Sequence, residues 1–302
     1  MTSLRRADLL TLSNLRNDGR KPNELRRMTI QMSPMDTTAT CGSALVQMGI
    51  TTVLAYVDGP MDCARRADEL TDRAILEVNV STAPFAPSSG DRRTSNSSTD
   101  RRLIEQSSLL QKALEASVLL HLHPKTRVVV NVRVFADDGG RLCAAINAAT
   151  LALVDAGIAM RDLVCACAVG STDIGFQSIG GVEDDTDEDD VEDIESNDIP
   201  ILLDLNSQEI SGGFQSSGGA AAYLLCATMP QRNTLVLSQC ESRLPSIKVF
   251  ERMLATGMDG CEEVFHIMRA SLKERVGIVS AARRGTARIH LGMDQRDYSN
   301  KM

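Results

Sequence analysis

The chain has very few aromatic residues: it contains no Trp, and Phe, Tyr and Trp together make up 3% of its 302 residues. We therefore expect a core of aliphatic side chains, Met and Ala. No uncharged apolar run approaches the about 20 residues that span a bilayer, so we expect no membrane partner. The N-terminus, MTSLRRADLL, is polar and charged, and we expect no signal peptide. These features are typical of a globular protein of one large or two modest domains.

Several catalytic and metal-binding patterns are also missing. The eight Cys residues form no CxxC pair, and the chain has no Walker loop, no G-x-S-x-G and no zinc spacing. Cys165 and Cys167 alternate in LVCACAVG, which places both on one face of a strand. We interpret the cysteines as buried, reduced thiols of an intracellular protein, and expect no resident metal or other cofactor.

The net charge of −8 comes from one segment. Between Glu183 and Asp198 there are 11 acidic residues and no basic one; without them, 29 acidic residues stand against 32 Lys and Arg. The body of the protein is therefore mildly basic. Such a block repels itself, so we predict an acidic disordered insertion over about 181–198.

Hydrophobic periodicity predicts strands and helices in an order that occurs twice. Short alternating runs separated by turn residues predict strands. Helices are predicted over about Asp100 to Leu120, from Arg141 to Gly157, and from about Ser246 to Val276. Strands followed by helices, twice over, favour an α+β architecture of two related halves. We divide the chain into an N-terminal arm (1–20), one domain (21–276) and a C-terminal extension (277–302).

Two helix starts carry arginines that suit an anion. Arg101 and Arg102 are predicted in a first helical turn, where cations oppose the helix dipole unless an anion joins them. The alternative is that they pair with Asp100 or Glu105, and this segment alone does not choose between the two. Further on, Gly139 and Gly140 permit a tight turn whose N–H groups can cup an oxyanion, with Arg141 entering the next helix.

Other arginines, among them Arg65 and Arg66, fall in predicted loops and suit contact with a nucleic-acid backbone. Solvated charge is the plainer interpretation of any single one. No aromatic residues are interleaved with these arginines, so we expect RNA contact to be electrostatic.

One apolar run ends in a carboxylate. In IPILLDLNSQEI a buried strand is predicted to deliver Asp204 to a site, and Glu209 is the next acidic residue. In an extended segment, a one-residue shift from Glu209 to Ile210 turns a side chain to the opposite face.

The chain resembles the ribonuclease PH-like subunits of the RNA exosome, of the type that carries the phosphorolytic site in archaea. The matching segments cover most of residues 18–206 in family order, and include DGRKPNELRRM, GSALVQMGITTVLAYVDGP, LTDRAILEVNVSTAPF, DRRLIEQSSLLQKALEASVLLHLHPKT, ADDGGRLCAAINAATLALVDAGIAMRDLVCACAVG and LLDLN. The resemblance implies a ribonuclease PH-like fold of two related β/α halves (ribosomal protein S5 domain 2-like), with mixed sheets packed with helices. It also implies a six-membered ring with other ribonuclease PH-like subunits, through which single-stranded RNA passes.

Family members with activity use inorganic phosphate to release nucleoside diphosphates from RNA 3′ ends. The positions that match the family's RNA and phosphate contacts are Arg65 or Arg66, Arg101, Arg102, Gly140 and Arg141. Asp204 matches the first of two carboxylates, but Ile210 stands where the second is expected, and Gly140 replaces a hydroxyl residue common at the phosphate site.

We therefore expect a non-catalytic, eukaryotic exosome ring subunit in the nucleus (including the nucleolus) and cytoplasm, with Asp204 a vestigial catalytic residue. Its implied partners are S1/KH-type cap subunits and hydrolytic exosome nucleases. Two alternatives remain open: an active phosphorolytic 3′–5′ exoribonuclease that uses Mg²⁺ and inorganic phosphate, with Glu209 or a partner residue completing the site, and a free-standing transfer-RNA-trimming enzyme like bacterial ribonuclease PH.

Overall fold

The computed structural model describes residues 15–16, 18–35, 41–63, 65, 69–83, 85–86, 97–171, 201–210, 222–240 and 247–283. The acidic insertion, residues 284–302 and most of the N-terminal arm lie outside these ranges, so the predictions about them stay predictions.

A mixed five-stranded sheet forms the first half, in the order β1-β2-β3-β5-β4. Its strands are β1 (Met28–Met32), β2 (Gly42–Met48), β3 (Thr51–Asp62), β4 (Ile75–Thr82) and β5 (Thr126–Ala136). The pairs are antiparallel except β4 with β5, which run parallel. Val53, Ala55 and Val57 are buried and alternate with half-exposed residues, as a sheet with one covered face requires.

The second half contains an antiparallel four-stranded sheet in the order β7-β6-β8-β9. Its strands are β6 (Cys165–Ser171), β7 (Ile201–Leu203), β8 (Ala222–Met229) and β9 (Thr234–Cys240). Every residue of β6 is buried, which indicates that both faces of this sheet are covered.

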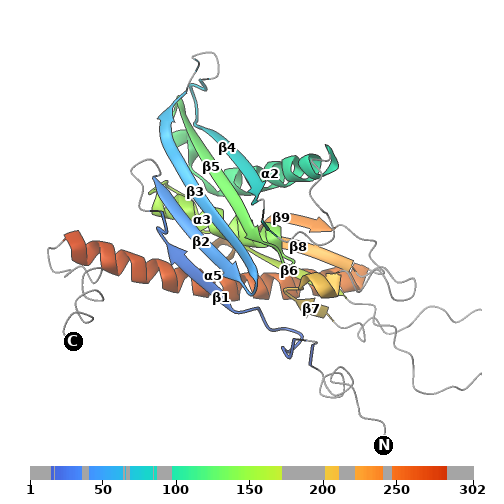
Figure 1. The fold of residues 1–302 in the computed structure, drawn as a ribbon. Helices are drawn as coiled ribbons and strands as arrows, with labels where there is room; N and C mark the ends of the chain where they lie inside the picture. Colours follow the sequence, from blue (N-terminus) through green and yellow to red (C-terminus); the bar gives the residue numbers. More distant parts are fainter. Residues whose placement is uncertain are drawn as a thin grey trace, which may run out of the picture.

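Helices separate and cover the two sheets (Figure 1). α3 (Arg141–Asp155) lies between them, buried from Leu142 to Leu153, and contacts β2 and β3 on one side and β6 on the other. Its Asn147 side chain exchanges hydrogen bonds of 2.8 and 3.0 Å with the backbone of Ala166 in β6. α2 (Ser97–Ser117) packs on β4 and α3. α5 (Ile247–Arg283) covers the second sheet and contacts β6 and β8.

The α+β prediction of two β/α halves is confirmed, while some helix ends differ. α2 begins at Ser97 and ends at Ser117, earlier than predicted, and a 3-10 turn, η2 (Leu120–Leu122), follows it. α5 continues to Arg283, beyond the predicted end near Val276. A second 3-10 turn, η3 (Pro230–Arg232), joins β8 to β9. No described helix is both long enough and apolar enough to cross a membrane.

Candidate functional site

The turn from Asp137 to Arg141 joins β5 to α3 and requires glycine. Gly139 and Gly140 have φ values of 84° and 65°, in the left-handed region, and a Cβ on Gly139 would lie 2.8 Å from the Leu205 carbonyl oxygen. Gly140 is the N-cap of α3, and no side chain caps that end. The free N–H groups of the first helical turn can therefore bind an anion by donating hydrogen bonds to it. The predicted glycine turn before a helix is confirmed.

Arg141 lies at this helix start and keeps hydrogen-bonding capacity. Its Nη1 lies 3.4 Å from the Asp137 carboxylate, so it forms an ion pair within the turn. Its Nε is buried and has no hydrogen-bond partner in the described structure. A buried donor without a partner costs free energy, and an oxyanion beside the turn would satisfy it.

Asp204 follows β7 directly, as predicted, but its carboxylate is fully committed. The residue is 0% exposed and has a φ of 53°. Its Oδ2 accepts from the Arg26 backbone N–H at 3.0 Å and from Arg26 Nε at 2.9 Å, and its Oδ1 accepts from Arg26 Nη2 at 2.7 Å. This bidentate pair places Arg26 on both oxygens, and because the residue is 0% exposed, neither oxygen is accessible to a metal or a proton donor from solvent.

Arg26 also ties Asp204 to the glycine turn. It donates to the carbonyl oxygens of Asp138 at 2.9 Å and Gly139 at 3.1 Å. Burial acts to lower the pKa of Arg26, but the hydrogen bonds and charge of Asp204 outweigh burial and raise that pKa above its ordinary value. Sequence reasoning missed Arg26. The available signal was that a buried carboxylate needs a cation, although the sequence does not say which arginine supplies it.

The segment after Asp204 is helical from Ser207 to Ile210, so the expectation for an extended segment, that Glu209 and Ile210 face opposite sides, does not apply. The Asn206 side-chain oxygen accepts from the Glu209 N–H at 3.0 Å, and Glu209 accepts from the Asn206 N–H at 3.0 Å. This reciprocal pair is a capping box, which starts a helix.

Glu209 also forms an ion pair with Arg16. Arg16 Nε and Nη2 donate to the two Glu209 carboxylate oxygens at 2.9 and 2.5 Å. Asp204 and Glu209 thus have separate arginine partners, and the Ile210 side chain has no oxygen that could bind a metal. A divalent metal does not fit these donors, and among the described residues no three His, Cys, Asp or Glu side chains gather to hold one.

Arg101 and Arg102 are exposed and occupy the fifth and sixth positions of α2. The prediction that they lie in the first helical turn is wrong, because the helix already begins at Ser97; their N–H groups point into the helix and only their guanidinium groups are available. In the described part of the chain, Glu105 forms no ion pair with either arginine. The side chain of Asp100 lies outside the description.

The N-terminal end of α2 lies toward the glycine turn. The Ala74 N–H, just before β4, donates to the Leu120 carbonyl, just after α2, at 2.9 Å. The end of α2 is therefore beside the start of β4, and its first residues lie toward the end of β4. Because β4 and β5 are parallel, that end of the sheet also carries the turn after β5.

Arg65 is exposed at the opposite end of the first sheet. It follows β3, whose last residue, Asp62, pairs with Thr126 at the start of β5, whereas the glycine turn follows the end of β5. The structure therefore does not bring Arg65 to Gly140 and Arg141. Arg66 lies outside the described residues.

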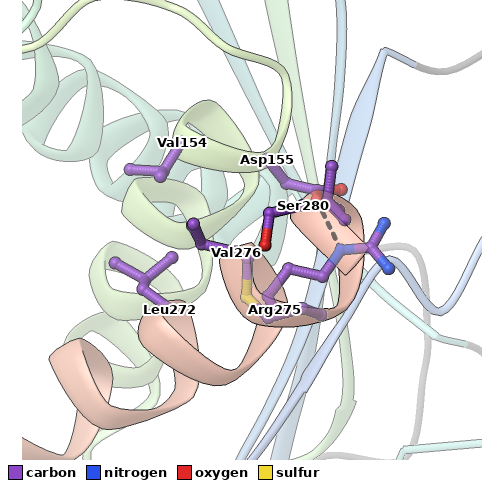
Figure 2. A pocket seen from close by; sticks show the side chains of 8 residues that line it. Val154, Asp155, Leu272, Arg275, Val276 and Ser280 are labelled. Carbon is purple, nitrogen blue, oxygen red and sulfur yellow. Dashed lines mark ion pairs between the residues drawn. The ribbon is translucent and has the colours of Figure 1, made fainter. Parts of the chain in front are cut away.

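A pocket of about 320 Å³ lies elsewhere, between β1, the end of α3 and the last turns of α5. Figure 2 shows Val154, Leu272 and Val276 around it, with the ion pair of Arg275 Nε and Asp155 Oδ1 at 3.5 Å on one side. None of the predicted site residues lines this pocket.

Comparisons with known proteins agree with this architecture. Residues 24–159 match the model of the 3′ exoribonuclease family, domain 1 (RNase PH). The chain is 33% identical over 261 residues to the exosome complex component RRP41 homolog of Arabidopsis thaliana, which covers 86% of this chain and 92% of that protein.

Two solved structures share the fold. Rice (Oryza sativa) Rrp46 has a TM-score of 0.64 and 25% identity, covering 85% of this chain and 100% of that one. A chain of the Archaeoglobus fulgidus exosome with RNA bound to the active site has a TM-score of 0.61 and 21% identity, covering 85% and 93%. The chain therefore belongs to the RNase PH family of 3′ exoribonucleases and, within it, to the Rrp41-type subunits of the exosome core.

Proposed function

We propose that this exosome core subunit builds the ring and guides single-stranded RNA through its channel without phosphorolytic activity of its own. The observation that carries the proposal is the bidentate pairing of Arg26 with Asp204. It uses the one carboxylate that matches the family's pair, while Ile210 stands at the position of the other.

Phosphorolysis needs more than an anion site. Inorganic phosphate must be held against the terminal phosphodiester, and a proton or a metal must stabilise the leaving 3′-oxygen. The start of α3 and Arg141 supply the anion site. A metal could reach the buried Asp204 carboxylate only if the Arg26 pair rearranged, and removing Arg26 altogether would leave a buried charge unpaired at a cost of several kcal/mol. In this proposal the chain holds RNA but does not break it.

The partners follow from family membership. We infer other RNase PH-like subunits as ring neighbours, S1/KH-type subunits as the cap, and hydrolytic nucleases as the enzymes that cut the RNA. The RNA bound in the related Archaeoglobus fulgidus exosome supports contact with RNA in this chain. We place the assembly in the nucleus, including the nucleolus, and in the cytoplasm.

The test uses the purified native assembly with single-stranded RNA, Mg²⁺ and inorganic phosphate, and measures nucleoside diphosphate release. Assemblies carrying the unmodified chain, Arg141→Ala or the control Arg232→Ala, an exposed arginine in η3, should release the same background amount. Release that falls at least about tenfold in Arg141→Ala but not in Arg232→Ala would establish the alternative, an active phosphate-dependent 3′–5′ exoribonuclease.

A further inference from the structure

We propose that Phe85 and Phe135 form an aromatic platform on which a base of single-stranded RNA stacks, beside the glycine turn. This inference rests on the proposed RNA-guiding function and adds to it a contact with the base. It departs from the expectation that RNA contact is electrostatic alone, because the fold brings together two aromatic residues that lie 50 positions apart in the sequence.

The two rings form an ordered and accessible pair. Their centroids are 6.0 Å apart and their planes differ by 22°, which is a stacked arrangement. Phe85 is 72% exposed, whereas Phe135 is half-buried on β5. The face of the Phe85 ring that points away from Phe135 is therefore available for stacking with an RNA base.

The backbone around Phe85 is fixed to the sheet. The Ala83 N–H donates to the Val134 carbonyl at 2.8 Å, and the Ala86 N–H donates to the Ala83 carbonyl at 3.0 Å. Because the backbone is fixed and the Phe85 ring already stacks on Phe135, the ring loses little conformational entropy when a base stacks on it.

The platform lies at the end of the sheet that binds the phosphate in our proposal. Phe135 is the second-last residue of β5, and the Asp137–Arg141 turn follows at once. The first residues of α2, with Arg101 and Arg102, lie toward the same end. An RNA strand whose phosphate contacts the Asp137–Arg141 turn can thus place a neighbouring base against Phe85.

The charge around the platform favours a polyanion as its occupant. Arg133 is exposed two residues before Phe135, on the same face of β5, and lies over the Tyr56 ring at 5.8 Å. Within the described part of the chain, Arg133, Arg101 and Arg102 form no ion pair. Other exposed apolar residues, such as Ile50 and Leu122, are single aliphatic side chains and suggest no ligand. Aromatic faces with unpaired arginines are the combination that binds single-stranded nucleic acid.

The test compares two RNA oligomers of equal length, one normal and one with abasic ribosides at its last positions, binding to the native assembly. Phe85→Ala should weaken binding of the normal oligomer by about tenfold and leave the abasic oligomer unchanged, because only stacking is lost. Phe85→Tyr, which keeps a ring, should restore most of the affinity. Leu122→Ala, at the far end of the sheet, is the matched control and should have no effect.

Three results would overturn the platform: equal weakening for both oligomers, no weakening for either, or loss of ring neighbours from the Phe85→Ala assembly in a native size measurement, which would identify a protein contact. The proposed function is judged separately. If Arg101→Glu weakens RNA binding and Phe85→Ala does not, only the platform fails; if neither does, the RNA-guiding function fails as well.

Discussion

Asp204 is a fully buried acidic residue in a left-handed backbone conformation. Both features cost free energy, so the residue needs stabilising interactions with its surroundings. Arg26 stabilises the Asp204 carboxylate through the bidentate ion pair. The backbone carbonyl of Asp204 also accepts from Arg16 and Arg20, each at 3.2 Å. Three arginines from the start of the chain thus converge on one residue, which now attaches the N-terminal segment to the second sheet.

At this residue scale we predict that Arg26→Met lowers the free energy of unfolding by about 3–5 kcal/mol, because Asp204 would be left as an unpaired buried charge. Urea denaturation of the purified full chain measures the change. Arg27→Met is the matched control: its side chain is exposed, and the expected change is within about 0.5 kcal/mol. Equal effects of the two substitutions would show that the Asp204 pair is not structural.

At the scale of elements, local periodicity predicted most strands and the helices because burial repeats every two or every 3.6 residues. The helix after Asp204 was predictable too: Asn206 and Glu209 have the spacing of a capping box, and the apolar run before them drew attention away from it. The Arg26–Asp204 and Phe85–Phe135 contacts were not, because such partners are chosen by tertiary packing. The parallel pairing of β4 with β5 was not predictable either, because tertiary packing also decides which strands pair.

Buried thiols give the packed elements a pH dependence. Burial raises the pKa of Cys143 in α3 and of Cys165 in β6 above the ordinary 9.0. Above about pH 9 the unfolded chain loses these protons and the folded chain keeps them. Stability is therefore fully present below about pH 9 and falls as the pH rises beyond it, by about 1.4 kcal/mol per pH unit for each thiol.

We thus expect the free energy of unfolding, measured under reducing conditions, to fall more steeply between about pH 9 and about pH 11 in the natural chain than in a Cys143→Ala/Cys165→Ala variant. Each alanine alone should remove part of the difference. Parallel curves for the natural chain and the double variant would mean that these thiols do not titrate with folding.

For the whole molecule, the distribution of charge along the chain matters more than the net charge. The acidic excess lies in the segment from Glu183 to Asp198, and the remaining chain is slightly basic. Exposed arginines at the end of the first sheet that carries the glycine turn can therefore attract RNA although the protein is acidic overall.

At this scale we predict that Arg101→Glu or Arg102→Glu reduces RNA protection by the assembly, most strongly at low salt. Loss of one phosphate contact should lower the slope of log affinity against log salt by about 0.7. Lys112→Glu, an exposed charge reversal farther along α2, is the control. If all three variants protect RNA like the natural chain at low salt, α2 does not face the channel.

The glycine at position 140 has a consequence for protein engineering. A Cβ there would lie 2.9 Å from Arg26 Nη2, which cannot retreat without releasing Asp204 Oδ1 and the Gly139 carbonyl. A hydroxyl residue placed at 140 would therefore disturb the Arg26–Asp204 pair that attaches the N-terminal segment to the second sheet, and it would also have to adopt a left-handed backbone conformation.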